Sequence, residues 1–148
     1  MFERTKIGEH EMWFEPDAGI LHLVTCGMLN GEEATKLSEL VVAFRSDLDP
    51  QEPTFILVDN RKSTGITKDG RLAMAESSNS LTAPSVTAVF GGSFALRALV
   101  NLIFKGIALT SDKTLLHYAA DEAAARAWLS ERQRSYRARK GAPSTPDG

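Results

Sequence analysis

The sequence predicts an α/β domain built on a mostly parallel five-stranded sheet, with an antiparallel hairpin at its N-terminal side and about four helices. Along the 148 residues, short runs of β-branched and aliphatic side chains alternate with segments of helical periodicity. Proline, glycine and polar residues gather between the two kinds of segment, as is typical of turns. The strand-to-helix step repeats, which is the order of a parallel sheet joined by right-handed crossovers.

A β-hairpin is predicted near the N-terminus. Residues 6–15 alternate in part, with Met12 and Phe14 on the same parity, and end at residues 16–19, PDAG, a turn sequence. Residues 20–26, ILHLVTC, supply the second strand because β-branched and aliphatic side chains favour extended backbone.

A first helix follows, with Asn30 as its N-cap and glutamates in its first turn. Its apolar residues recur at helical spacing as far as Ser46: Ala34, Leu37, Leu40, Val41 and Phe44. Pro50 and Pro53 end that pattern, and residues 54–59, TFILVD, form a short continuous apolar run. Such a run predicts a central parallel strand that is buried on both faces.

The unit of strand, turn and helix is then predicted to repeat. Residues 60–65, NRKSTG, have the composition of a polar turn, which leads to a helix over 68–80 with Thr67 as its N-cap. Residues 85–90, SVTAVF, form the next strand, and the sequence Gly91-Gly92-Ser93 turns into an apolar helix over 94–109.

The last predicted strand covers residues 114–118, TLLHY. Asp121 caps a final helix that runs through Trp128 and Leu129 into a basic segment, residues 132–140.

Composition indicates one globular domain over residues 1–140, followed by residues 141–148, GAPSTPDG, as a disordered tail with nothing to bury. Hydrophobic residues make up 43% of the chain and charged residues 24%. The N-terminus lacks the apolar run of a secretory signal, and a lone cysteine, Cys26, excludes an intramolecular disulfide and a multi-thiolate metal site. We therefore expect a cytoplasmic location and no membrane span.

The basic segment contains five cations: Arg132, Arg134, Arg137, Arg139 and Lys140. Taking them away from the net charge of -2 leaves about -7 for the rest of the chain. The segment could meet nucleic acid, anionic lipid or an acidic partner, or it could be a solvated helix end whose cations suit the helix dipole. We favour the helix end, and without a recognisable nucleic-acid module we expect no nucleic-acid partner.

The predicted helix over residues 94–109, FALRALVNLIFKGIAL, has more apolar surface than a helix on one face of a sheet needs. Its polar residues Arg97, Asn101 and Lys105 recur every four positions and so form one narrow stripe. The surplus apolar surface could be covered by the core, by a second copy of the chain or by an apolar ligand.

Three segments resemble the STAS superfamily, the domain of anti-sigma factor antagonists and sulfate-transporter tails, and more narrowly the SpoIIAA-like family of small bacterial proteins also labelled STAS/SEC14. They are residues 55–67 (FILVDNRKSTGIT), 88–105 (AVFGGSFALRALVNLIFK) and 121–129 (DEAAARAWL). The resemblance covers most of residues 5–130 and implies a sheet wound with helices as a βα superhelix. It indicates the fold better than an activity.

One departure from that family concerns phosphorylation. In anti-sigma antagonists an Asp-Ser pair opens the helix after the strand that ends in Asp, and that Ser is the phosphorylated switch. Here Thr67 and Lys68 occupy the comparable places, so the switch does not simply carry over. Ser63, Thr64 and Thr67 remain candidate phosphate acceptors at a helix N-terminus, where the dipole favours negative charge.

Two clusters are candidate ligand-binding sites. Gly92 and Ser93, with Arg97 one turn later, offer backbone N–H groups, a hydroxyl and a guanidinium to an anion, although Gly91-Gly92 could simply make the tight turn. Asn60 and Arg61 follow a central strand at the sheet edge where α/β proteins usually bind ligands. We favour the other interpretation, because Asp and Asn at a strand end, here Asp59 and Asn60, more often satisfy local turn donors.

The histidines His10, His22 and His117 have no spacing typical of a metal site and are expected to be structural. We predict no catalytic residues, no metal and no cofactor.

The function predicted first is a non-enzymatic STAS-like regulatory module that binds a partner protein or small ligand in bacterial signalling, with a homodimer as one form of partnership. The alternative is an apolar-ligand or lipid-binding domain with a pocket beneath helix 94–109, as the SEC14 label suggests. An enzyme is the least favoured class.

Overall fold

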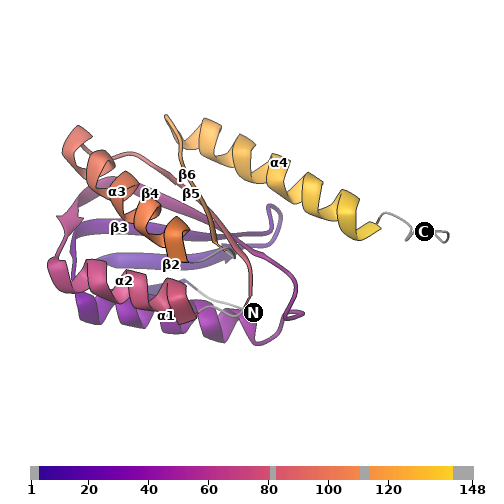
Figure 1. Cartoon of the computed structure of the whole chain (residues 1–148), viewed down its shortest axis with the longest axis horizontal. Helices are drawn as coiled ribbons and strands as arrows, with labels where there is room; N and C mark the ends of the chain where they lie inside the picture. Colours follow the sequence, from indigo (N-terminus) through magenta and orange to yellow (C-terminus); the bar gives the residue numbers. More distant parts are fainter. Residues whose placement is uncertain (1–3, 81–82, 111–113, 142–148) are drawn as a thin grey trace.

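In the residues that the structure describes, six strands form one mixed sheet whose spatial order, β1-β2-β3-β4-β5-β6, is also their order along the chain (Figure 1). The structure is a computed structural model, and it describes residues 4–80, 83–110 and 114–141. The strands are β1 (Thr5–Ile7), β2 (His10–Glu15), β3 (Ile20–Leu29), β4 (Thr54–Ile66), β5 (Ser85–Phe90) and β6 (Thr114–Tyr118). Strands β1 to β3 are antiparallel, and β3 to β6 are parallel. The predicted α/β class is confirmed.

The helices divide between the two faces of the sheet. They are α1 (Gly31–Arg45), α2 (Lys68–Ser80), α3 (Phe94–Thr110) and α4 (Glu122–Gly141). One core cluster joins α1 and α3 to the sheet through Leu37, Leu96 and Val100, with α2 packed against it. The second cluster places α4 on the opposite face through Ala125 and Leu129. Figure 1 shows α4 apart from the other helices, with its C-terminal end projecting from the body of the domain.

The N-terminal strands differ from the prediction, because residues 6–15 are not one strand. Gly8 adopts a left-handed φ of 61° and turns the chain between β1 and β2, which makes a sixth strand. A Cβ atom at this position would meet only the end of the Glu33 side chain, so it is the left-handed turn that favours glycine here.

The predicted polar turn over residues 60–65 is wrong, because β4 continues through it to Ile66. Its partner β3 also runs on, and the two pair through Cys26 with Lys62 and Leu29 with Ile66. Two register shifts between the strands, each with an extra residue on β4, accommodate the extension. Pairing with β3 supplies the backbone hydrogen bonds that the polar side chains of this segment would otherwise seek in a turn.

The N-caps predicted from the sequence are confirmed. Asn30 and Glu33 form a reciprocal capping box, with Glu33 N–H donating to the Asn30 side chain at 2.8 Å. The hydroxyl of Thr67 accepts from Gly70 N–H at 3.0 Å, and Asp121 accepts from Ala124 N–H at 2.8 Å. A cap of this kind is worth about 1 kcal/mol.

The apolar helix α3 is only partly covered. On its inner side Leu96, Val100 and Ile107 are buried, whereas on its outer side Leu102 and Leu109 are 67% and 87% exposed. None of the helices in the described ranges has both the length and the apolar character needed to cross a bilayer. The predicted disordered tail, residues 141–148, lies outside the described residues except for Gly141, the last residue of α4.

Candidate functional site

The predicted ligand-binding residues come together where β5 and β6 end. Asn60 and Arg61 do not follow a strand as predicted but lie within β4, just past the point where its pairing with β5 stops at Asp59 and Phe90. Gly91 and Gly92 have φ values of 87° and 93°, which favour glycine. A Cβ atom on Gly91 would lie 2.8 Å from the backbone nitrogen of Arg61, and one on Gly92 would lie 3.3 Å from the carbonyl oxygen of Asn60. The loop after β5 therefore packs directly against the β4 residues.

Tyr118, the last residue of β6, joins this cluster and was not predicted. Its hydroxyl donates to the Gly91 carbonyl oxygen, and the guanidinium of Arg97 lies 5.0 Å from the centre of its ring. Burial raises the pKa of Tyr118, against smaller opposing effects of a hydrogen bond with Asn60 and the charge of Arg97. Nothing in the TLLHY pattern distinguishes this tyrosine from an ordinary strand residue.

Asn60 is buried and held by a residue of the neighbouring strand. The Thr25 hydroxyl lies 2.6 Å from the Asn60 side-chain oxygen and 3.2 Å from the Asp59 carbonyl oxygen. These contacts fix the amide inside the sheet, so Asn60 positions its neighbours rather than facing solvent.

Ser93 and Arg97 differ in what they leave open to a ligand. The Ser93 hydroxyl accepts from Leu96 N–H at 3.1 Å and so serves as the predicted N-cap of α3. Arg97 is exposed and makes no ion pair with any residue that the structure describes. The cation, and not the hydroxyl, is therefore the group free to meet an anion.

Arg61, by contrast, is already engaged with carboxylates. Its guanidinium donates to Asp59 from Nε at 3.1 Å and from a terminal nitrogen at 2.7 Å, and it lies 3.7 Å from Glu122. Burial alone would raise the pKa of Asp59, but the hydrogen bonds from the Arg61 side chain and backbone outweigh it and lower the pKa. The backbone N–H of Arg61 also donates to the Asp59 side chain, a local contact typical of aspartate.

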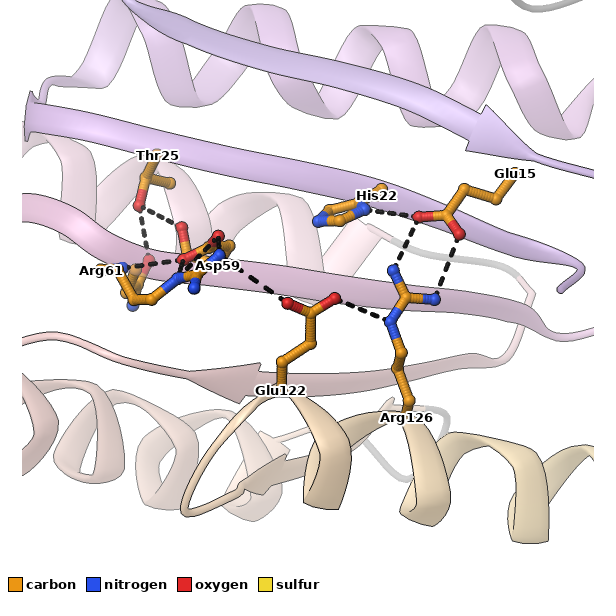
Figure 2. Close-up of polar contacts among 8 residues, drawn as sticks. Glu15, His22, Thr25, Asp59, Arg61, Glu122 and Arg126 are labelled. Carbon is orange, nitrogen blue, oxygen red and sulfur yellow. Dashed lines mark hydrogen bonds and ion pairs between the residues drawn. The ribbon is translucent and has the colours of Figure 1, made fainter.

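A chain of ion pairs continues from Glu122 across the sheet face covered by α4 (Figure 2). Arg126 donates to Glu122 at 2.8 Å and to both oxygens of Glu15 at 3.0 and 3.1 Å. Glu15 in turn lies 2.5 Å from Nδ1 of His22. Hydrogen bonding from Arg126 is the main cause that lowers the pKa of Glu15, and partial burial opposes it less strongly. The network ties α4 to β2, β3 and β4.

The three histidines lie in separate places. His10 is buried, accepts from Cys26 N–H at 3.0 Å and lies 3.2 Å from Glu33. His22 is 7% exposed, and its Nε2 has no hydrogen-bond partner among the described residues. His117 stacks on Trp128 with ring centres 4.8 Å apart. Within the described ranges, no three histidine, cysteine or acidic side chains gather in a geometry that could hold a metal ion.

The candidate phosphate acceptors are split between two elements. Ser63 and Thr64 lie within β4, not at a helix N-terminus, because that strand extends to Ile66. Thr67 does lie at the N-terminus of α2, where its hydroxyl caps the helix. Phosphorylation at any of these positions stays a prediction.

Two hollows in the described residues lie toward the amino ends of the parallel strands. The larger, of about 560 Å³, lies under the C-terminal half of α4, and the smaller, of about 100 Å³, lies near Phe14 and Phe44. No residue of α3 lines either of them. The inner face of α3 is packed, so these hollows give no support to a pocket beneath helix 94–109.

Comparison with solved structures shows a similar fold elsewhere. The chain is similar to an uncharacterized protein of the DUF3478 family from Shewanella loihica PV-4 with a SpoIIAA-like fold. The TM-score is 0.56 over 87% of this chain and 92% of that one, at 12% sequence identity. No protein-family model and no curated protein matches the sequence. At this level of identity the likeness concerns the fold alone.

Proposed function

Because the chain has the SpoIIAA-like α/β fold that its motifs predict, we propose that it is a non-enzymatic regulatory module that binds a partner protein through the exposed face of α3. The partner presents apolar side chains flanked by carboxylates.

The observation that carries the proposal is the exposure of large apolar side chains on one side of α3. Phe94, Leu102 and Leu109 are 88%, 67% and 87% exposed. At 3.6 residues per turn, these positions fall within about a quarter of the helix circumference. Large apolar side chains gathered on a surface are typical of a protein-binding face, because water contact with them is unfavourable.

The charge on the same face indicates which partner fits. Lys105 is exposed between the apolar residues and Arg97 is exposed at the margin of this face, and α3 contains no acidic residue. Two copies paired through α3 in antiparallel fashion about Asn101 would bring Arg97 beside Lys105, which is a like-charge contact. An acidic surface on a different protein avoids that repulsion and gains two favourable contacts.

The non-enzymatic part of the proposal is supported by how the acids of the ion-pair chain are held. Asp59 and Glu15 both have lowered pKa values, so they stay ionised and bound to arginine near neutral pH. A general acid or base works best with a pKa near the working pH. The hydroxyls of Ser93 and Thr67 are committed to helix caps.

The test is a photo-crosslinking amino acid placed at Leu102 in the full chain expressed in its own cells. Val42 on α1, 63% exposed, is the matched control position. We expect one defined adduct from Leu102, none from Val42, and loss of the adduct when Arg97→Glu is added. The same adduct from both positions, or retention with Arg97→Glu, would contradict the proposal. A dimer in native mass spectrometry that Leu102→Asp dissociates would instead make the second copy the partner.

A further inference from the structure

The larger hollow lies on the face of the sheet opposite α3, where the C-terminal half of α4 passes over the amino ends of β4, β5 and β6. Its volume is about 560 Å³, within the range of about 300–1,000 Å³ typical of small-molecule sites. Its lining differs sharply between the sheet side and the helix side.

The sheet side of the hollow is apolar. Phe55, Val86 and Leu115 occupy neighbouring strands in one row, since Phe55 pairs with Val86 and Val86 pairs with Leu115. Pro53 and Pro84 extend this floor at the strand starts. Leu115 is 44% exposed, so part of the floor faces solvent when nothing lies on it.

The helix side of the hollow is basic. Arg132, Tyr136 and Arg139 line it at spacings of four and three, which place them on one face of α4. The same face carries Ala125 and Leu129 earlier in the helix, and both are fully buried against the sheet. Apolar side chains at positions 132, 136 and 139 would pack on the sheet and close the hollow. The long cationic side chains instead leave it open above the apolar strands.

The two arginines lack a counter-anion inside the hollow. Nε of Arg132 is buried and has no hydrogen-bond partner among the described residues. The Arg132 guanidinium lies 3.7 Å from the Glu131 carboxylate, so this ion pair is long. It also lies 5.8 Å from the centre of the Trp128 ring. Arg139 makes no ion pair within the part of the chain that the structure describes.

We propose that this hollow binds a small amphipathic anion, with an apolar body on Phe55, Val86 and Leu115 and a carboxylate or phosphate head at Arg132 and Arg139. An uncharged apolar ligand leaves Arg132 Nε unpaired, and inorganic phosphate leaves the floor in water. Both halves of the lining are satisfied only by a molecule with both parts. The site is independent of partner binding at α3, so either proposal can fail alone.

The experiment is isothermal titration calorimetry of the full chain with octanoate, octan-1-ol and inorganic phosphate. We expect one saturable octanoate site, with octan-1-ol and phosphate at least about tenfold weaker, because a charge-assisted contact to arginine is strong. The double variant Arg132→Met with Arg139→Met should weaken octanoate about tenfold or more. The control pair Arg134→Met with Arg137→Met removes the same charge from the same helix outside the hollow, and should change affinity less than about twofold.

Equal binding of octanoate and octan-1-ol, equal losses in both double variants, or no saturable octanoate binding would overturn the proposal. Should the Arg132 and Arg139 pair be needed for folding, Leu115→Trp fills the hollow from the sheet side and is also expected to abolish binding. Co-sedimentation with phosphatidylglycerol vesicles separates the sources of the anion. If the unmodified chain co-sediments and only the double variant Arg132→Met with Arg139→Met does not, the source is a membrane lipid. If the unmodified chain does not co-sediment, the source is a free amphiphile.

Discussion

Arg126 on α4 holds Glu15 at the end of β2 through two hydrogen bonds of 3.0 and 3.1 Å, although 111 residues separate them in the sequence. The contact joins the antiparallel start of the sheet to the last helix. It also places Glu15 between an arginine and His22, so one carboxylate connects three elements.

Replacing Arg126 is expected to destabilise the domain. Arg126→Met keeps most of the side-chain volume but leaves Glu15 and Glu122 without their shared cation, and we expect a loss of about 1–2 kcal/mol in unfolding free energy. Urea denaturation measures it. Arg134→Met on the same helix, where the arginine is exposed and its hydrogen bond to Ser130 is long at 3.4 Å, is the control and should change stability by less than about 0.5 kcal/mol. Equal effects of the two changes would contradict the structural role of the bridge.

Stability should fall in acid through Glu15 and Asp59. Both carboxyls have folded-state pKa values below their ordinary values of 4.5 and 3.8. Their contribution is therefore complete above the ordinary values and is lost as the pH falls through the lower folded values. Urea unfolding at pH 7, 5, 4 and 3 measures this, and Glu15→Gln should flatten the decline below about pH 4.5. An unchanged acid decline in Glu15→Gln would contradict the assignment.

The loop after β5 should not tolerate a side chain at Gly91. Gly91→Ala forces a left-handed φ of 87° on alanine and places its Cβ 2.8 Å from the Arg61 backbone nitrogen, so we expect a loss of about 2 kcal/mol or more. Gly27 is the matched comparison, because it has a φ of 73° with no atom within 4 Å of a Cβ. Gly27→Ala should lose only about 1 kcal/mol. Thermal and urea unfolding of the two variants would show equal losses if close packing against β4 were unimportant.

Thr67 should be replaceable by aspartate but not by alanine. Asp is as good an N-cap as Ser and somewhat better than Thr, whereas Thr67→Ala removes the acceptor for Gly70 N–H and should destabilise the domain by about 1 kcal/mol. Circular dichroism during urea titration measures both variants. If Thr67→Asp is as unstable as Thr67→Ala, negative charge at this helix start is not accepted, and phosphorylation there would be disfavoured.

Substitutions on the outer side of α3 should leave the fold intact. Leu102→Gln exchanges one exposed side chain for another and should change stability by less than about 0.5 kcal/mol. Val100→Ala on the buried side should lose about 2 kcal/mol by creating a cavity. Chemical denaturation compares them, and a large loss in Leu102→Gln would mean that this side serves the core and not a partner.

The sequence alone predicted those parts of the fold that depend on neighbouring residues. The central strand through residues 54–59, the caps at Asn30, Thr67, Ser93 and Asp121, and the helix that follows Gly92 were all predicted, since each depends on residues within a few positions. The predicted burial of that strand on both faces is only partial, because Phe55, Ile56 and Val58 are half-buried. The extension of β4 through residues 60–66 was missed because only pairing with β3, about 35 residues away, makes that polar segment a strand.

The candidate site, like the fold, was predicted only in part. Gly92 and Arg97 follow the carboxyl end of β5 as the rule for strand ends predicts, but Asn60 and Arg61 lie beside them within β4, which continues to Ile66. The partners that decide their chemistry come from elsewhere: Tyr118 lies beneath Arg97, and Glu122 lies beside Arg61. No spacing in one sequence identifies such contacts, because they depend on where β6 and α4 settle.

The strand order of the sheet, identical to the order of the chain, has a consequence for how the domain forms. Each new strand adds beside one that already exists, so loop closures stay short and the sheet can grow progressively during synthesis. The bridge from Arg126 to Glu15 is the exception, because it requires almost the whole chain. We therefore expect Glu15 to have only His22 as its partner until α4 emerges and supplies Arg126, which makes the last helix the element that completes folding.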